Sequence, residues 1–261
     1  MARGPKKHLK RVRAPKAWLM NKMGGVFTVK PNAGPHKARE SIPLQVILRD
    51  KLKFALTGRE ADVILHQKEG LVRVDKKIRR DPKYPVGFMD VIDIPKVGVS
   101  YRVLYDVKGR YVFTKVNKAE AVFKLCRITR KEMGPNKIAY LVTHDGRTIR
   151  FADKDIKIND TIKYNLDTKE IAESFPMAVG SLAMVSDGSN TGRVGTVVHI
   201  SQLDGNFDLV TLKDSRGHTF TTRINYVFVI GKGGKSAITL PRGDGIKYSI
   251  QEETEHRLNN E

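Results

Sequence analysis

Lysine and arginine dominate the start of the chain, and phosphate binding is the chemistry they suggest. Residues 1–39 contain eleven Lys or Arg and no Asp or Glu, and the first acidic residue is Glu40. Such a stretch repels itself in water and buries too little apolar surface to fold alone. Nucleic-acid phosphates suit it best, because each Lys or Arg contact releases condensed counterions. We therefore predict an RNA partner. The leader residues assigned to RNA are Arg3, Lys6, Lys7, Lys10, Arg11, Arg13, Lys16, Lys37 and Arg39.

The excess positive charge is concentrated in the first third of the chain. Residues 1–80 carry 21 basic and 6 acidic side chains, a net of +15, whereas residues 81–261 carry 27 and 22, a net of +5. Such asymmetry is typical of proteins that bind nucleic acid or an anionic membrane. An ordinary solvated surface is the alternative. An acid-free stretch this long, in a chain with a pI of about 10, favours the polyanion.

Patterns that could support an enzyme are weak. Residues 231–236 have the composition of a phosphate-binding loop, but the first glycine of that motif would fall at Val229, and no helix is expected to follow. The seven histidines share no metal-ligand spacing with Cys126, the one cysteine. We expect Cys126 to be a small buried hydrophobe on a strand. We therefore predict no catalytic residue, no metal, no cofactor and no small-molecule substrate.

The same composition bears on location. One cysteine excludes an internal disulfide framework and suits a reducing compartment. No apolar run approaches the length of a membrane span, and the basic N-terminus lacks the apolar core of a secretory signal. We expect a soluble intracellular protein with no membrane partner.

The elements that must position the cations follow from residue spacing. A first helix is expected from Ser41, an N-cap residue, and a second from Thr57, where Thr57 and Glu60 have capping-box spacing. Alternating strands follow from Leu71 to Ile94. We predict a small α+β module over residues 42–95 behind an extended leader of residues 1–41. The leader is expected to order against a partner surface and partly against this first domain.

The rest of the chain is predicted to be β-rich, which makes the fold class α+β and mostly β. Residues 96–175 form a central β domain, with hairpin turns at residues 106–110 and 144–147. Asp145-Gly146 predicts a type I′ turn, and residues 156–164 predict two strands around Asn159-Asp160. Residues 176–230 predict a small barrel, and residues 231–261 a loop and a short C-terminal helix within 246–258.

Residues 42–94 resemble the RNA-binding fold first described in bacterial ribosomal protein four. The resemblance lies in the helix pair with Leu44, Leu48, Leu52 and Thr57-Gly58-Arg59, in the segment VRVDKK at 72–77, and in PVGFMDVI at 85–92. In that family the helix pair and the turn after it present a basic face to RNA. Carried onto this chain, the candidates are Arg49, Lys51, Lys53, Arg59, Lys68, Arg73, Lys76, Lys77, Arg79 and Arg80. Leu44, Ile47, Leu48 and Leu52 recur at helical spacing and predict one buried apolar stripe. The candidates lie off this stripe or in the turn, where Lys and Arg can pair with phosphate.

Residues 182–200 resemble a KOW motif, a β-hairpin element of many ribosomal proteins and elongation factors, here in a barrel like that of SH3 domains. Gly188, Gly192 and Gly195 permit positive φ and close approach of another backbone. Arg193 is the RNA-binding candidate. The turn holds only this one basic residue, so a protein contact or a purely structural role stays open.

Both modules, in this order after a basic leader, resemble one family end to end: the eukaryotic and archaeal small-subunit ribosomal protein four, distinct from its bacterial namesake. The leader MARGPKKHLKR and the segments YDVKGR at 105–110, THDGRTIR at 143–150 and NYVFVIG at 225–231 carry the resemblance. It implies a structural, rRNA-binding constituent of the small ribosomal subunit with roles in assembly and translation. It also implies neighbouring ribosomal proteins as partners, and a cytoplasmic ribosomal location with nucleolar transit if the source is eukaryotic. The alternatives are an RNA-modifying enzyme or a KOW-type transcription factor that uses the same module.

Overall fold

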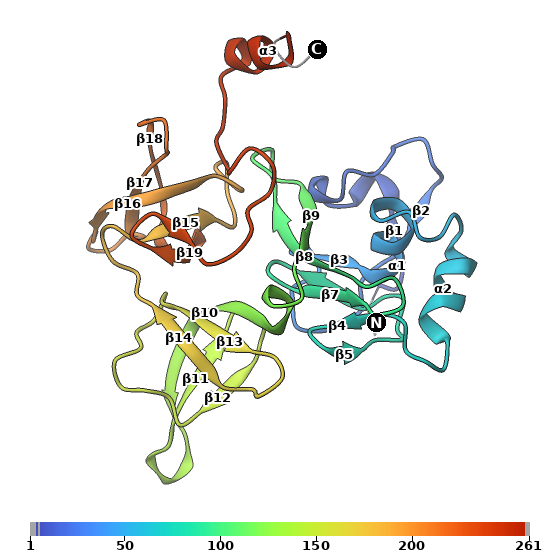
Figure 1. Ribbon diagram of the computed structural model, residues 1–261, viewed down its shortest axis with the longest axis horizontal. Coiled ribbons are helices and arrows are strands. Elements are labelled where there is room, and N and C mark those ends of the chain that lie inside the picture. Colours follow the sequence, from blue (N-terminus) through green and yellow to red (C-terminus); the bar gives the residue numbers. More distant parts are fainter. Residues whose placement is uncertain (1–3, 5, 259–261) are drawn as a thin grey trace.

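The structure, a computed structural model, describes residue 4 and residues 6–258, without the side chains of residues 256 and 257. In that part of the chain the strands form five sheets. The leader and the first module lie on one side of the molecule, and the central β domain and the KOW-like part lie one above the other on the opposite side (Figure 1). The mostly β fold predicted from the sequence is confirmed.

The leader is ordered by one anchor and one short strand pair. Trp18 is fully buried, and its indole nitrogen donates a hydrogen bond to the Ser41 carbonyl oxygen at 2.8 Å. The pair aligns Leu9 with Thr28. The leader therefore packs on its own first domain, as expected. Its elements are β1 (Leu9–Lys10), η1 (Arg11–Arg13), η2 (Lys16–Trp18) and β2 (Phe27–Thr28).

The first module has the predicted helix pair, but its first helix begins later than expected. Ser41 pairs with Gly87 in a short sheet, and the helix starts after Pro43. Proline disfavours the helical conformation of the residue before it, so Ile42 stays extended. The elements are β3 (Ser41–Pro43), α1 (Leu44–Val46), the π-helical turn η3 (Ile47–Lys51), α2 (Gly58–His66), β4 (Arg73–Val74), β5 (Lys77–Ile78), β6 (Pro85–Gly87) and β7 (Val91–Ile94).

The capping box of the second helix is confirmed. The Thr57 hydroxyl oxygen accepts a hydrogen bond from the Glu60 amide at 3.3 Å, and the Glu60 carboxylate accepts one from the Leu56 amide at 2.8 Å. Ala61 and Leu65 form the buried face of this helix. The cap fixes where the helix starts, and the buried face fixes which side meets solvent.

The main sheet of the first module contains two more strands than the sequence predicted. The hairpin of β8 (Val99–Tyr105) and β9 (Tyr111–Val116) extends it, in the order β5-β4-β7-β8-β9. From the sequence, this hairpin was predicted to belong to the central domain. The tight turn after β7, where the Gly98 amide donates to the Ile94 carbonyl oxygen at 3.0 Å, folds β8 directly back onto β7 instead.

The central sheet is antiparallel, in the order β12-β11-β10-β13-β14. The predicted hairpin at Asp145-Gly146 is present, but its turn is not type I′: Gly146 has a φ of 73°, whereas Asp145 has no positive φ. Residues 156–160 form a turn rather than a strand. The elements are η4 (Glu120–Val122), β10 (Phe123–Met133), η5 (Pro135–Lys137), β11 (Ala139–Thr143), β12 (Thr148–Arg150), β13 (Thr161–Asn165) and β14 (Ile171–Phe175).

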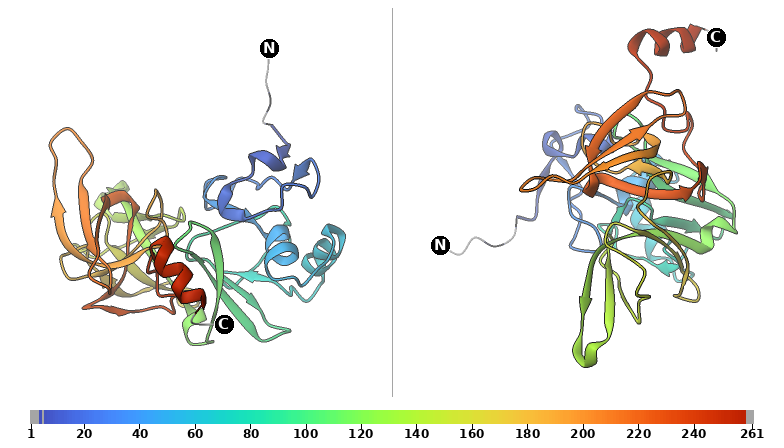
Figure 2. Two further views of the ribbon diagram at one scale, coloured as in Figure 1. Left: turned by 90° about the horizontal axis from the view of Figure 1, so that it is seen from above. Right: turned by 90° about the vertical axis from the view of Figure 1, so that its left-hand side faces the viewer.

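The KOW-like part is a sheet in the order β18-β17-β16-β15-β19-β20. Gly233 and Gly234 form the turn between β19 and β20, so residues 231–236 are a hairpin and not a phosphate loop. The last helix, predicted within residues 246–258, is confirmed; it protrudes from the body of the molecule (Figure 2), where Glu252 pairs with Arg216 and Glu253 with Lys108. The elements are β15 (Leu182–Val185), β16 (Val194–Ser201), β17 (Leu209–Lys213), β18 (Thr219–Arg223), η6 (Ile224–Tyr226), β19 (Val227–Lys232), β20 (Lys235–Ser236) and α3 (Ile250–Leu258).

Three hydrophobic cores hold these parts together. The largest joins the leader and first module to the KOW-like part, since Trp18, Val103 and Phe228 belong to the same cluster. The second lies mainly in the central domain but includes Val91 of β7 and Val116 of β9, and the third lies within the KOW-like part. Among the described residues, no helix has both the length and the apolar character that a membrane crossing requires.

Candidate nucleic-acid interface

Most of the leader cations predicted to bind RNA are exposed. Arg11 is the exception: its guanidinium donates to the Asn21 carbonyl oxygen, and to that of Gly24 at 3.0 Å. Arg11 therefore closes the loop of residues 11–24, which presents its neighbours. Arg3 lies outside the described residues. The exposed cations are Lys6, Lys7, Lys10, Arg13, Lys16, Lys37 and Arg39.

The leader and the first module enclose a groove that the sequence analysis did not foresee. The groove has a volume of about 780 Å³, and no acidic residue lines it. Two of its cations, Lys30 and Lys83, were not among the predicted site residues. Lys83 lies in the turn before β6. Only the tertiary fold brings it next to the leader, so the sequence spacing did not identify it as a site residue. We call this the phosphate groove. Its cations are Lys6, Lys7, Lys30, Lys37 and Lys83.

The helix-pair cations divide into free and engaged groups. Lys53, Arg59 and Lys68 are exposed. Arg49 pairs with Asp50 at 2.8 Å, and that hydrogen bond raises the pKa of Arg49. Burial lowers the pKa of the half-buried Lys51. The exposed three are therefore the ones available to a phosphate without breaking an existing contact.

The turn after β4 presents its cations through an unusual backbone. Asp75 and Lys76 both have positive φ, at 51° and 63°, in the two-residue hairpin between β4 and β5. Lys77 and Arg80 are exposed, and within the described residues neither has an ion-pair partner. Lys76 lies 4.0 Å from Asp93.

The two remaining arginines of this segment are partly buried. The guanidinium of Arg79 lies 4.4 Å from the centre of the Tyr84 ring. Both Arg73 and Arg79 have a buried Nε without a hydrogen-bond partner among the described atoms. Because these two donors are buried, a phosphate at the surface does not reach them in this conformation.

Arg193, the candidate in the KOW-like hairpin, is engaged inside the protein. Its guanidinium pairs with the buried Asp214 and lies 3.7 Å from the centre of the Phe220 ring, and its side chain is 11% exposed. A Cβ on the neighbouring Gly192 would lie 2.0 Å from the Asp106 carbonyl oxygen, so this hairpin packs directly on the β8–β9 turn. RNA contact by Arg193 stays a prediction, and this geometry favours a structural role.

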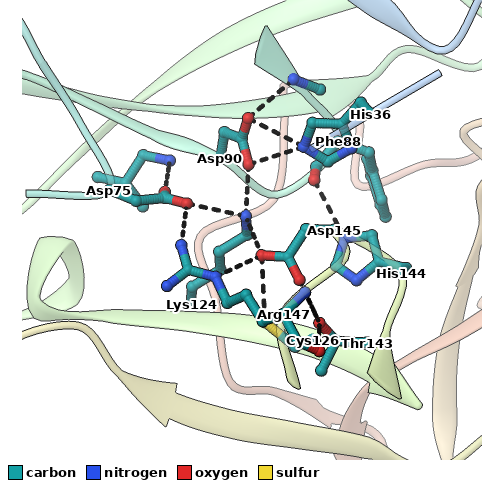
Figure 3. A network of polar contacts seen from close by, with 12 residues as sticks. His36, Asp75, Phe88, Asp90, Lys124, Cys126, Thr143, His144, Asp145 and Arg147 are labelled. Atoms are coloured by element: carbon teal, nitrogen blue, oxygen red, sulfur yellow. Dashed lines mark hydrogen bonds and ion pairs between the residues drawn. The ribbon is translucent and has the colours of Figure 1, made fainter. Parts of the chain in front are cut away.

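A buried charge network, missed from the sequence, connects three parts of the chain (Figure 3). Lys124 of β10 is fully buried and lies 3.0 Å from Asp75 and 2.9 Å from Asp145, and it also pairs with Asp90. His36 of the leader joins it, with Nε2 3.0 Å from the Asp90 carboxylate. We call these residues, with Arg147, the lysine hub.

Asp90 and Lys124 hold each other in their charged forms. Burial favours neutral acids, but His36 and Lys124 outweigh it and hold the pKa of Asp90 well below its usual range. Burial likewise opposes the charge on Lys124, but its three carboxylate partners raise the pKa of Lys124 well above normal. Both Lys124 and its neighbour Leu125 are fully buried on β10. A lysine in a strand buried on both faces is the one signal that could have revealed the hub.

Cys126, His144 and Asp145 come together beside the hub, with possible ligand atoms within 4.8 Å of one another. Their chemistry does not suit a cation. Burial raises the pKa of the Cys126 thiol well above normal, which keeps the thiol protonated. Asp145 already pairs with Lys124 and with Arg147 at 2.6 Å. Burial also lowers the pKa of His144 to about 3, so its imidazole is neutral.

Four family models match the chain. They are the RS4NT domain at residues 3–39, the S4 domain at 42–92, the ribosomal family S4e at 97–171, and the 40S ribosomal protein S4 C-terminus at 214–261.

Curated relatives match over nearly the whole length. The small ribosomal subunit protein eS4 of Carabus granulatus is 53% identical over 258 residues, which cover 99% of this chain and 98% of that protein. The protein of the same name from Tetrahymena thermophila is 49% identical over 257 residues, covering 98% and 99%. Among solved structures, the 30S ribosomal protein S4e of Thermoplasma acidophilum is 37% identical, with a TM-score of 0.65, and covers 76% of this chain and 99% of its own.

Proposed function

This chain belongs to the ribosomal family S4e, and we propose that it is a structural constituent of the small ribosomal subunit that binds rRNA and supports subunit assembly and translation. Its partners are the small-subunit rRNA and neighbouring ribosomal proteins, and its location is the cytoplasmic ribosome, with nucleolar transit in a eukaryote. The observation that carries the proposal is the phosphate groove, a concave surface lined by five cations and no acid. Such a groove suits an RNA backbone, because phosphate and 2′-hydroxyl contacts dominate RNA recognition.

The mechanism is electrostatic anchoring combined with shape recognition. Trp18 fixes the leader on the first module, so the cations of both face the same groove. Further cations available to RNA are the exposed Lys77 of β5, Arg80 after it, and the exposed helix-pair residues Lys53, Arg59 and Lys68. Each phosphate contact releases counterions, which makes binding dependent on salt concentration.

We also propose that the chain is not an enzyme. What supports this is the state of the one group of residues whose types suggest nucleophilic chemistry. Cys126 is fully buried and protonated, and Asp145 is committed to two cations. A nucleophile needs access to substrate and a base that can take its proton, and this group offers neither.

The salt dependence of RNA binding tests the proposal. The double variant Lys7→Glu/Lys83→Glu should lower the slope of log Kd against log salt by roughly 0.7–0.9 for each lost phosphate contact. Lys137→Glu, at an exposed position in the tip of the central hairpin, is the matched control and should leave the slope unchanged. An unchanged slope in the double variant would show that the groove does not face RNA. Sedimentation of a lysate should place the chain with small subunits, and a large free pool would count against the ribosomal role.

A further inference from the structure

The four parts of the chain meet around a second cavity with a volume of about 510 Å³, which lies beside the phosphate groove and shares His36 and Lys37 with it. The leader contributes Lys37 and Arg39 to its wall, the β8–β9 hairpin Tyr105, the central domain Arg127, and the KOW-like part Asn225. This is the size of a pocket that encloses one small ligand. The predicted site residues do not explain it, because only Lys37 and Arg39 of that set line it.

Aromatic rings form the floor of this cavity. The Phe88 ring stacks on Tyr105, with centroids 5.1 Å apart and an angle of 16° between the planes. Phe228 meets Phe88 edge to face, also at 5.1 Å. The Tyr105 and Tyr111 hydroxyl groups lie 3.2 Å apart. These contacts hold the rings rigidly, and because Phe88, Tyr105 and Tyr111 are only 4–7% exposed, a planar ligand packs against the small part of each ring that faces the cavity.

The wall of the cavity contains both basic and acidic side chains, and one of its arginines has a nitrogen without a hydrogen-bond acceptor. Lys37, Arg39 and Arg127 supply three cations, against the carboxylates of Glu40 and Asp187. Arg127 Nη1 donates to the Val227 carbonyl oxygen at 3.2 Å, but its Nε is buried without a partner among the described atoms. A buried donor left unpaired is costly, so the hydrogen-bonding capacity of Arg127 is not fully used within the protein, and an anionic oxygen in the cavity is an acceptor suited to its guanidinium.

The combination narrows the ligand class. Lys37 already pairs with Glu40, but an apolar ligand would leave Arg39 and Arg127 without an anionic partner in the cavity, and a simple inorganic anion would make no use of the aromatic floor. A nucleotide offers a planar ring, an edge with hydrogen-bond donors for carboxylates, and a phosphate for Arg127. Proteins recognise unstacked RNA bases with such sets of aromatic rings, guanidinium groups and polar side chains.

We propose that this cavity receives a single unpaired nucleotide extruded from an RNA strand, with its base on the aromatic floor and its phosphate at Arg127. The inference rests on the proposed function and adds to it one specific contact. A free mononucleotide presents the same chemistry, so the experiment must separate the two sources.

The test uses the full chain and two hairpin RNAs that differ only in one bulged 2-aminopurine nucleotide. Stacking of one base on an aromatic surface should make the bulged RNA bind about tenfold more tightly than the paired one. Asn225→Trp narrows the cavity through an exposed side chain and should abolish this preference while leaving binding of the paired RNA unchanged. Asn206→Trp, in the exposed loop before β17, is the matched control and should keep the preference.

Binding of the paired RNA also reports folding of each variant, which separates a blocked cavity from a damaged protein. If the wild-type chain binds both RNAs equally well with a normal salt slope, the inference fails and the proposed function stands. If it binds neither, the proposed function fails. Tighter binding of free 5′-AMP than of the bulged RNA would overturn an RNA-borne nucleotide.

A second measurement does not depend on any variant. Ultraviolet cross-linking of assembled particles, followed by mass spectrometry, should give a nucleotide adduct on the peptide that contains Asn225 and Tyr226. A cross-link from that peptide to a neighbouring protein, with no nucleotide adduct, would show that a protein side chain fills the cavity.

Discussion

Replacing Lys124 by methionine should be among the most destabilising single changes in the chain. The substitution keeps the volume and removes the charge, which leaves Asp75, Asp90 and Asp145 facing one another with Arg147 and His36 as their remaining partners. Unit charges 3 Å apart attract by roughly 5–6 kcal/mol at an effective dielectric constant of 20. Desolvation of the ions offsets much of this. Breaking one member of a buried pair therefore costs about 3–5 kcal/mol of unfolding free energy.

The pH dependence gives this prediction its sharpest form. In the wild-type protein the pKa values of Asp90 and Asp145 lie well below normal, because nearby cations outweigh the effect of burial. These carboxylates stabilise the fold at every pH above their unfolded pKa of about 4, and the stability is lost only as the pH falls further. Without Lys124, burial raises the folded pKa above the unfolded value. The deficit of Lys124→Met should therefore be largest near neutral pH and smaller near about pH 5.

Urea denaturation of the purified full chain at several pH values measures this difference. Lys115→Met, at an exposed position on β9, is the matched control and should change the unfolding free energy by less than about 0.5 kcal/mol. A Lys124→Met deficit below about 1 kcal/mol, or one that does not vary with pH, would refute the argument that the hub is a tightly coupled set of charges.

Three further changes test individual contacts. Trp18→Ala should cost about 3–5 kcal/mol by urea denaturation and should expose the leader to limited proteolysis, since it removes the leader's anchor. Thr57→Ala should cost about 1 kcal/mol and speed amide exchange in the first turn of α2, and unaltered exchange would argue against the cap. Gly192→Ala should cost more than about 1 kcal/mol, because φ is 84° there and the new Cβ would meet Asp106; a neutral result would mean that the KOW-like hairpin does not pack on the β8–β9 turn.

The sequence predicted those elements that are determined by residues close to one another in the chain, such as helix caps and apolar helix faces. The spacing of Leu44, Ile47 and Leu48 predicted the buried face of the first helix, and Thr57 with Glu60 predicted the start of the second. The turn types were less predictable. The sequence favoured a type I′ turn at Asp145-Gly146, but two-residue hairpin turns with positive φ at both positions occur at Asp75-Lys76 and at Gly233-Gly234. Both Asp75 and Asp145 pair with Lys124 in the structure, so each turn also makes contacts that are distant in the sequence and that a local pattern does not contain.

The composition of the leader predicted its exposed cations, but not how they combine with the first module. Lys30 and Lys83 share the phosphate groove although they are far apart in the chain. Arg193 was predicted to contact RNA because it is a basic residue in a turn. In the structure its guanidinium contacts Asp214 and the Phe220 ring. The composition gives the number of charged side chains, but only the tertiary structure shows which of them are not already paired within the protein.

The lysine hub also constrains the order in which the protein matures during synthesis. Asp75 and Asp90 leave the ribosome before Lys124, so a nascent first module carries two carboxylates whose main cation has not yet been translated. That module reaches its full stability only after β10 has emerged and docked. Until residue 124 has been synthesised, the first module therefore lacks the lysine that pairs with Asp75 and Asp90 in the finished protein.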